Sequence, residues 1–455
     1  MSNPGKRYFG TDGIRGVAGQ PPLDAATVFA VGLALGEDLA RSGAGRVILG
    51  EDTRESSAGI AGQFAAGLQA RGLEVAYAGV LPTPGVAYLA ARGDFRAGVM
   101  ISASHNPYQD NGIKIFGAGG YKLPDAEEAG IEAALERYRQ QAPGPPAKLR
   151  AQPELRAAYV AHLAQRFAAT DFSALRLVVD CGHGAACAVV ADLCARLGLR
   201  AEILNAAPDG RNINAGVGAL HARGMAEHVH RHGADAGVSF DGDADRAILA
   251  DANGELVDGD CVLLLAAREL QVRRQLNPAI VVGTVMTNLG LEQALAQAGI
   301  RLERAPVGDK YVLERMQASG ALLGGEPSGH VIFAAEATTG DGLLTALHCF
   351  DLVARRHASL RSLCEGWRAL PQAIVNVRVG QKVPLAELAE VQAAIAAAEA
   401  EFAGNGRVLV RYSGTEMLAR VMVEAAAADE VARHAEAIAA ALRHDLGTQA
   451  AAGCP

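Results

Sequence analysis

Short apolar runs alternate with longer amphipathic stretches along most of the chain, and this pattern predicts alternating strands and helices. Residues 97–101 and 236–240 are apolar runs typical of buried strands, whereas 23–42 carries apolar residues at helical spacing behind the capping residue Asp24. Such alternation indicates α/β domains with mixed sheets. Further helices are predicted over 126–140, 153–169, 260–275 and 288–298, with further strands over 46–50, 175–180, 279–285 and 301–306. Asn253-Gly254 predicts the turn of a hairpin.

A proline-rich segment and a change of pattern mark the predicted domain boundaries. The prolines within 142–147 continue neither a helix nor a strand, so this segment is predicted to be a linker. From about residue 371 the order becomes strand, helix, two strands and helix, which predicts a smaller α+β domain. A chain of 455 residues is too long for one hydrophobic core. We expect four domains, over residues 1–147, 148–254, 255–368 and 369–455.

Composition limits the kinds of partner. Half of the residues are hydrophobic, 20% are charged and the formal net charge is −8, so neither a nucleic acid nor an anionic membrane is an expected partner. Any phosphate site must therefore be a local basic pocket. The seven cysteines show no Cys-x-x-Cys pair, and we expect free thiols. Without an apolar signal core or a run of membrane-spanning length, the chain is expected to be cytoplasmic.

A polar loop directly follows the predicted strand 97–101. It reads Ser102-Ala-Ser-His-Asn-Pro-Tyr-Gln-Asp-Asn-Gly-Ile-Lys114. The Asn-Pro dipeptide disfavours a helical conformation at Asn106. In α/β proteins, catalytic and binding residues usually lie on polar loops at strand ends. Taken alone, an ordinary turn rich in serine and asparagine explains this loop equally well.

A second loop, Asp241-Gly-Asp-Ala-Asp-Arg246, places three carboxylates at alternate positions after the strand 236–240. Clustered negative charge is costly without a cation, and carboxylate oxygens suit Mg²⁺. A calcium EF-hand would require glycine at position 246 and glutamate at 252, where the chain has arginine and alanine. An aspartyl-phosphate phosphatase motif would require threonine or valine at position 245, where the chain has aspartate. A solvated acidic turn stays open as an alternative.

Two further loops carry groups suited to a sugar phosphate. Glu326 and Ser328 lie two residues apart among glycines and can present acceptors to neighbouring hydroxyls, although a Pro-Gly turn is the simpler explanation. The segment Arg411-Tyr-Ser-Gly-Thr-Glu416 combines an arginine, hydroxyls and a glycine, which is the set that a phosphate dianion needs.

These loops, in this order, resemble those of the α-D-phosphohexomutases, most closely the bacterial members that act on glucosamine phosphate. The resemblance covers nearly the whole chain and implies four domains, three of them similar α/β domains, around a central cleft. It implies a phosphoserine at Ser104, with His105, Lys114 and Arg15 as further catalytic residues. Arg15 lies in the N-terminal segment Arg7-Tyr-Phe-Gly-Thr-Asp-Gly-Ile-Arg-Gly16, which also matches the family. It also implies one Mg²⁺ per chain, held by Ser104, Asp241, Asp243 and Asp245. The implied substrate-binding residues are Arg246, Lys310, Glu326, Ser328, His330, Arg411, Ser413, Gly414 and Thr415. Of these, Lys310 is implied to lie in a loop over residues 308–312.

The implied reaction interconverts glucosamine 6-phosphate and glucosamine 1-phosphate through a 1,6-bisphosphate intermediate, in the supply of amino-sugar and cell-wall precursors. The expected partner is thus a small hexosamine phosphate, and the expected oligomeric state is a monomer or a homodimer. Pro327, Tyr412 and Met417 depart from the family pattern. The alternatives are a glucose or mannose phosphate substrate, an aspartyl-phosphate phosphatase using Asp241, and a non-catalytic sugar-phosphate sensor.

Overall fold

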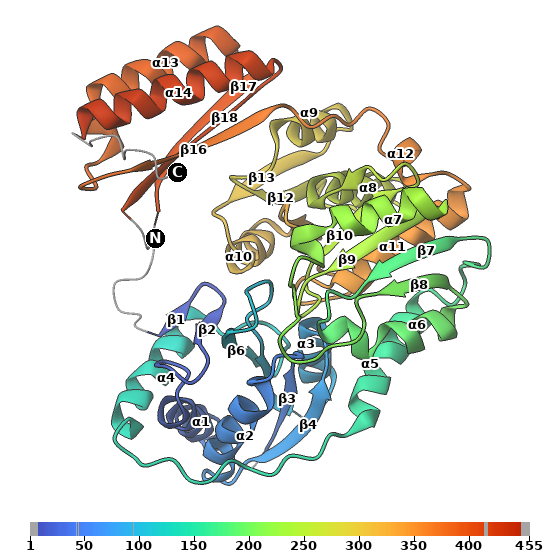
Figure 1. The fold of residues 1–455 in the computed structure, drawn as a ribbon, viewed down its shortest axis with the longest axis vertical. Coiled ribbons are helices and arrows are strands. Elements are labelled where there is room, and N and C mark those ends of the chain that lie inside the picture. Colours follow the sequence, from blue (N-terminus) through green and yellow to red (C-terminus); the bar gives the residue numbers. More distant parts are fainter. Residues whose placement is uncertain (1–7, 42, 44, 94, 414–416, 447–455) are drawn as a thin grey trace. The chain divides into compact units, whose positions relative to one another are not determined.

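The computed structural model describes residues 8–41, 43, 45–93, 95–413 and 417–446 (Figure 1). These residues form two compact units, which we describe separately. The larger unit contains three β-sheets with their surrounding helices, and it runs to Glu365 except for residues 288–294. The other unit contains residues 288–294 and the chain from residue 366.

The first sheet of the larger unit is mixed, with strand order β1-β2-β6-β5-β3-β4. Strand β3 pairs in parallel with β4 and β5, whereas β6 pairs antiparallel with β5 and β2. Its strands are β1 (Phe9–Gly10), β2 (Gly13–Val17), β3 (Arg46–Glu51), β4 (Glu74–Val80), β5 (Phe95–Ile101) and β6 (Asp110–Gly117). Its helices are α1 (Ala25–Ala40), α2 (Ser57–Gln69), α3 (Thr83–Arg92) and α4 (Asp125–Tyr138).

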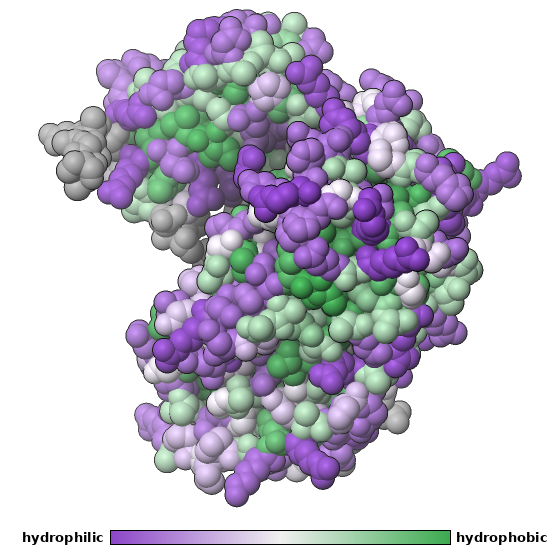
Figure 2. All heavy atoms as spheres, turned by 45° about the vertical axis from the view of Figure 1, so that its right-hand side comes forward, coloured by the Kyte–Doolittle hydropathy of each residue, from purple (hydrophilic) through white to green (hydrophobic). Residues whose placement is uncertain are grey.

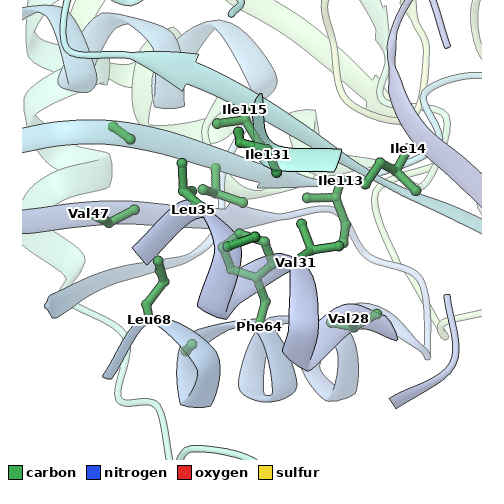
Figure 3. Close-up of a cluster of buried hydrophobic side chains, with 14 of the residues drawn as sticks. Ile14, Val28, Val31, Leu35, Val47, Phe64, Leu68, Ile113, Ile115 and Ile131 are labelled. Carbon is green, nitrogen blue, oxygen red and sulfur yellow. The ribbon is translucent and has the colours of Figure 1, made fainter. Parts of the chain in front are cut away.

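Alternate residues of these strands face two different helical layers. On one face Val47, Ile113 and Ile115 pack against the apolar sides of α1, α2 and α4, which include Val31 and Phe64 (Figure 3). On the other face α3 approaches the sheet closely, because β5 has a glycine, Gly98, opposite α3. As predicted, Asp24 caps α1 by accepting a hydrogen bond from the backbone N–H of Thr27 at 3.1 Å.

The second sheet has the order β11-β10-β9-β7-β8 and follows α5 (Pro153–Arg166). Strand β7 pairs in parallel with β8 and β9, and the antiparallel hairpin of β10 and β11 turns at Asn253 and Gly254, as predicted. Its strands are β7 (Arg176–Asp180), β8 (Arg200–Leu204), β9 (Ala236–Phe240), β10 (Ala247–Asp251) and β11 (Leu256–Val257). The helical segments here are η1 (Ala185–Ala188), α6 (Val190–Leu197), η2 (Ala219–His221) and α7 (Arg223–His232).

The third sheet has the order β13-β12-β14-β15. Its strands are β12 (Ile280–Thr284), β13 (Arg301–Ala305), β14 (Leu323–Gly325) and β15 (Val331–Phe333). The helices in this part of the chain are α8 (Gly259–Val272), α9 (Leu289–Gln297), α10 (Asp309–Ser319), α11 (Gly342–Arg356) and α12 (Leu360–Leu363), of which α9 lies largely in the other unit. The segment from Gly308 to Val312 was expected to be a loop, and most of it is the first turn of α10.

The C-terminal unit is an antiparallel sheet with the order β16-β18-β17, covered on one face by two helices (Figure 1). Its elements are β16 (Gln372–Arg378), η3 (Leu385–Glu387), α13 (Ala389–Phe402), β17 (Gly406–Tyr412), β18 (Leu418–Ala425) and α14 (Ala428–Asp445). The predicted fold class, three α/β domains with mixed sheets and a smaller α+β domain, is confirmed.

The expectation that every cysteine is a free thiol is wrong for one pair. Cys261 in α8 and Cys364 after α12 form a disulfide, although they are 103 residues apart in the sequence. Their spacing gave no signal because only tertiary packing brings them together. Cysteines that are free in the described part of the chain are Cys181, Cys187, Cys194 and Cys349.

The surface mixes residue types: hydrophilic and hydrophobic residues are interspersed on the face shown in Figure 2. Among the helices of the described residues, none is both long and apolar enough to cross a membrane.

Candidate active site

Ser104 lies just beyond β5 in a strained backbone conformation. Its φ of 53° is unusual for a residue other than glycine. The backbone N–H of Ser104 donates to Oγ of Ser102 at 2.9 Å, and Ser102 in turn donates to the buried carboxylate of Asp52 at 2.6 Å. The loop is therefore held from inside the domain, and the Ser104 hydroxyl is fixed in the interior.

Arg54 is the main support of this serine loop. Its guanidinium is fully buried and donates to the carbonyl oxygens of Ser104 at 2.9 Å, Asn106 at 2.8 Å and Asp110 at 3.0 Å. Its Nε donates to Asp52 at 2.8 Å. One planar group thus satisfies several carbonyls that the irregular loop leaves without strand partners.

The three aspartates of the 241–245 loop follow β9 and lie against the serine loop. The Ser104 hydroxyl donates to Asp241 at 2.5 Å. Close approach depends on Gly242, because a Cβ there would lie 2.4 Å from the Ser104 carbonyl oxygen. One carboxylate oxygen from each of Asp241, Asp243 and Asp245 lies within 4.8 Å of the others, and all three residues are buried.

The electrostatics of the three carboxylates fit a cation. Burial and the neighbouring Asp245 and Asp243 raise the pKa of Asp241 well above its ordinary value. Oδ1 of Asp243 and Oδ1 of Asp245 are buried atoms without a hydrogen-bond partner in the described part of the chain. A divalent ion with a preference for oxygen ligands would relieve the repulsion and occupy these free oxygens.

Lys114 joins the aspartates to the N-terminal strands. From β6 its buried ammonium contacts Asp243 at 2.8 Å, Asp12 at 3.1 Å and Asp245 at 3.2 Å. Burial opposes the charge, but Asp12 and Asp243 outweigh it and hold the pKa of Lys114 well above its usual value. Arg15, on β2, pairs with Asp12 and donates to the side chain of Asn106 at 3.3 Å. The predicted catalytic residues Ser104, Lys114 and Arg15 are thus brought together.

A second lysine, Lys122, extends this network to α10, a helix beside the third sheet. Its ammonium is hydrogen-bonded to both Asp12 and Asp309, the first residue of α10. Nε2 of His330 lies 3.7 Å from Asp309 and accepts a hydrogen bond from the backbone N–H of Gly340 at 3.2 Å. A chain of ion pairs therefore links Lys114 and Asp12 to Asp309, and His330, beside the loop that carries Glu326, lies next to its end.

A cavity of about 380 Å³ opens beside these groups. Predicted site residues supply much of its wall, namely Arg15, His105, Asp245, Arg246, Glu326 and His330. Burial, with help from Arg246 and Arg15, lowers the pKa of His105 to about 4, so its imidazole is neutral near pH 7. This volume lies within the range of small-molecule sites.

Glu326 and Ser328 lie in the turn between β14 and β15. One Glu326 oxygen accepts from the backbone N–H of Gly308 at 3.0 Å, and the other lies 3.5 Å from the Ser328 hydroxyl. Pro327 contributes its carbonyl oxygen, which accepts from the backbone N–H of Gly259 at 3.1 Å. The carboxylate is therefore oriented while keeping capacity to accept hydrogen bonds from a ligand.

Lys310 is the predicted substrate contact that the geometry supports least. Its buried ammonium pairs with Asp125 and with Glu128 at 3.2 Å, both in α4. It joins α10 to α4, and it is not part of the cavity wall.

The predicted phosphate loop lies in the C-terminal unit. Gly414 and Thr415 are outside the described residues, whereas Arg411 is the second-last residue of β17, which ends at Tyr412 just before Ser413. Arg411 lies directly opposite Arg420 of β18. Like charges on facing strands are destabilising unless an anion compensates, so this pair is consistent with a phosphate site.

The two departures beside the phosphate loop have local roles. The Tyr412 hydroxyl donates to the carbonyl oxygen of Val383 at 2.7 Å, and the Met417 carbonyl oxygen accepts from the backbone N–H of Val379 at 3.1 Å. Both contacts lie within the C-terminal unit.

Sequence reasoning missed several residues of this network. Asp12 sits inside the Gly-Thr-Asp-Gly segment that led to Arg15, and its charge beside an expected cation was an available signal. Arg420 could have been found by aligning the two predicted strands as a hairpin. Arg54, Lys122 and Thr83, whose hydroxyl donates to Asp243 at 2.5 Å, gave no signal because their partners are distant in sequence.

Family models cover nearly the whole chain in four consecutive segments. They describe the phosphoglucomutase/phosphomannomutase α/β/α domain I over residues 6–142, domain II over 157–254, domain III over 258–370 and the C-terminal domain over 374–441. The chain therefore belongs to the phosphoglucomutase/phosphomannomutase family of phosphohexomutases, as the sequence resemblance predicted.

Within this family the similar curated relatives share one name. The chain is 50% identical over 458 residues to the phosphoglucosamine mutase of Koribacter versatilis, covering 98% of this chain and 99% of the relative. It is 49% identical to that of Solibacter usitatus, covering 97% and 99%. Its fold matches a phosphoglucomutase/phosphomannomutase family protein from Burkholderia thailandensis with a TM-score of 0.78 at 24% identity, covering 96% and 97%.

Proposed function

We propose that this chain is a phosphoglucosamine mutase, an isomerase that interconverts glucosamine 6-phosphate and glucosamine 1-phosphate. Two phosphoglucosamine mutases that are 50% and 49% identical to this chain over nearly the full length of both proteins support the assignment. The observation that carries the mechanism is the Ser104 hydroxyl, buried and 2.5 Å from Asp241 within a cluster of three carboxylates. A strained serine beside a cation site is suited to carry a phosphoryl group.

Asp241, Asp243 and Asp245, with Ser104, would hold one Mg²⁺. The free Oδ1 atoms of Asp243 and Asp245 support this assignment. A structure of an N-acetylphosphoglucosamine mutase from Aspergillus fumigatus contains GlcNAc-6P and magnesium; its fold matches this chain with a TM-score of 0.63 at 20% identity. When bound, the ion would neutralise charge on the phosphoryl oxygens.

The cycle starts from the Ser104 phosphate. The O1 hydroxyl of glucosamine 6-phosphate loses its proton and bonds to phosphorus, while the bond from phosphorus to Oγ of Ser104 breaks and Oγ takes up a proton. The resulting 1,6-bisphosphate turns round, and its 6-phosphate returns to Ser104 by the same exchange. Because the phosphorylated enzyme is restored, the cycle needs no external phosphate donor.

The protein's part in this transfer is alignment and charge. Arg54 holds the backbone of the serine loop through hydrogen bonds to its carbonyl oxygens. Lys114, which follows this loop in the chain, forms an ion pair with Asp243 of the aspartate loop. Arg15 supplies a cation for the phosphoryl oxygens at the cavity wall. His105 is the candidate to receive the O1 proton, because it lines the cavity next to Ser104 in the chain.

Sugar and phosphate would be recognised by different loops. Glu326 and Ser328 would accept hydrogen bonds from sugar hydroxyls, with Arg246 and His330 beside them in the cavity wall. Arg411 and Arg420, with Ser413, Gly414 and Thr415, would bind the phosphate that is not being transferred. The four domains proposed at 1–147, 148–254, 255–368 and 369–455 would then contribute the serine, metal, sugar and phosphate loops in turn, an arrangement that the four matched family segments support.

The test compares kcat/KM for the 1-phosphates of glucosamine, glucose and mannose under one activation condition. We expect glucosamine 1-phosphate to be preferred. A preference for glucose or mannose 1-phosphate would overturn the proposed substrate and place the chain with the other members of the family. A Glu326→Gln variant should lose activity toward all three sugar phosphates, because the Glu326 carboxylate is proposed to accept hydrogen bonds from hydroxyls that the three sugars share.

A further inference from the structure

A group of histidines outside the active site faces a carboxylate on the second sheet. His228 and His232 are four residues apart on α7, and their rings stack with centroids 4.0 Å apart and planes 6° from parallel. Nε2 of His228 lies 2.9 Å from a carboxylate oxygen of Glu202 on β8. One ligand atom from each of these three residues lies within 4.8 Å of the others.

The local fold explains why the three side chains meet. On a helix, residues four apart share one face, so the buried contacts of Met225, Ala226 and Val229 with the sheet leave His228 and His232 at the side of α7. Glu202 lies on β8, the edge strand, in register with Val178 of β7, against which α7 also packs. Both elements belong to the same rigid layer.

We propose that Glu202, His228 and His232 bind a zinc ion. Two imidazoles at i and i+4 of a helix with one carboxylate from a neighbouring element form a donor set that zinc uses with water in the fourth position. A tetrahedral zinc ion holds its ligands about 3.3 Å apart, so small side-chain rotations would close the present separations of up to 4.8 Å.

The charge of the group agrees with this assignment. Glu202 is exposed, and an exposed carboxylate is ionised near neutral pH and therefore available to a cation. Nitrogen donors also separate this site from the aspartate cluster, whose ligands are all oxygens and which suits Mg²⁺. The ion would tie the edge strand β8 to the last turn of α7, which ends at Gly233.

The experiment uses untagged full-length protein, stripped with a chelator and dialysed against Zn²⁺ in a large excess of Mg²⁺. The Mg²⁺ occupies the aspartate cluster, and bound zinc is measured by elemental analysis across a titration. The variants are His232→Ala and Glu202→Gln. The matched control is His230→Ala, since His230 lies on the same helix, is exposed and is not part of the group.

We expect the wild type and His230→Ala to bind one zinc ion more tightly than His232→Ala and Glu202→Gln, by at least about tenfold in affinity. Co²⁺ in place of Zn²⁺ should give the visible absorption of a tetrahedral nitrogen and oxygen site in the first two proteins only. Equal zinc binding by all four proteins would overturn the proposal, and so would an equal loss in His230→Ala. Mutase activity is not the readout, so this result is independent of the proposed function.

Discussion

Arg54 offers a sharp test of how the serine loop is held. An Arg54→Met variant keeps the length of the side chain but removes the guanidinium that donates to the carbonyl oxygens of Ser104, Asn106 and Asp110. It also leaves the carboxylate of Asp52 buried without its cation. Breaking a buried ion pair from one side costs about 3–5 kcal/mol. With each kcal/mol worth roughly 2–4 °C in a domain of this size, Tm should fall by roughly 6–20 °C.

The catalytic effect should exceed what lost stability explains. Even in the folded fraction, well below Tm, Ser104 would no longer be aligned, and a misplacement of about 1 Å costs about 100-fold in rate. We therefore expect kcat to fall by roughly that factor while KM changes little, because Arg54 does not line the cavity. The fall in kcat would be measured by steady-state kinetics at a temperature where circular dichroism shows that the variant is folded.

Arg46→Met is the matched control. Arg46 is the first residue of β3, the strand that precedes Arg54 in the chain, and forms an exposed pair with Glu74 at 3.0 Å, worth less than about 1 kcal/mol. It should leave kcat unchanged. An Arg54→Met variant with kcat within twofold of the wild type would refute the idea that these carbonyl contacts position Ser104, whatever its Tm.

Three further predictions concern other parts of the chain. Asp243→Asn should weaken Mg²⁺ binding in calorimetry and lose most turnover, because it removes one of three ligand charges; full turnover would contradict a metal loop. Arg411→Ala should raise KM roughly tenfold or more in both directions, since a charge-assisted contact to phosphate contributes about 1.5–3 kcal/mol; impairment in one direction only would contradict a shared phosphate site. Burial raises the pKa of Glu51 to about 7 from 4.5, so its contribution to stability is full below about pH 4.5 and is lost as the pH rises through 7. Glu51→Gln should therefore gain about 2–3 kcal/mol over the wild type between pH 5 and pH 8, and a pH-independent difference in their thermal unfolding would contradict this.

Local patterns predicted the fold well because each element carries its own signals. Asp24 and the apolar spacing behind it give the start of α1 almost to the residue, and Asn253-Gly254 gives the turn of a hairpin. The family resemblance led us to expect a loop at 308–312, yet Asp309 is the first residue of α10. Acidic residues favour first helical turns as much as loops, and tertiary packing decides between them.

The chemistry of the site was predictable where it lies in contiguous motifs. Ser104 and the three aspartates come from two short segments, and the structure brings them together. The supporting contacts join residues that are far apart in sequence, such as Lys122 with Asp309, and no local pattern reports them. The family resemblance implies that Lys310 contacts substrate, and the ion pairs of Lys310 with α4 could not be seen in any local pattern.

The central claim is that Ser104 carries the transferred phosphoryl group. Purified protein would be incubated with glucosamine 1,6-bisphosphate, freed of small molecules, and analysed by intact mass and peptide mapping. It would then be exposed to glucosamine 6-phosphate in a single turnover. The account predicts one phosphoryl group on Ser104 that passes to the sugar, and none on a Ser104→Ala variant that keeps its fold. Phosphate on Asp241, or turnover by Ser104→Ala, would contradict the mutase mechanism and favour an aspartyl-phosphate phosphatase.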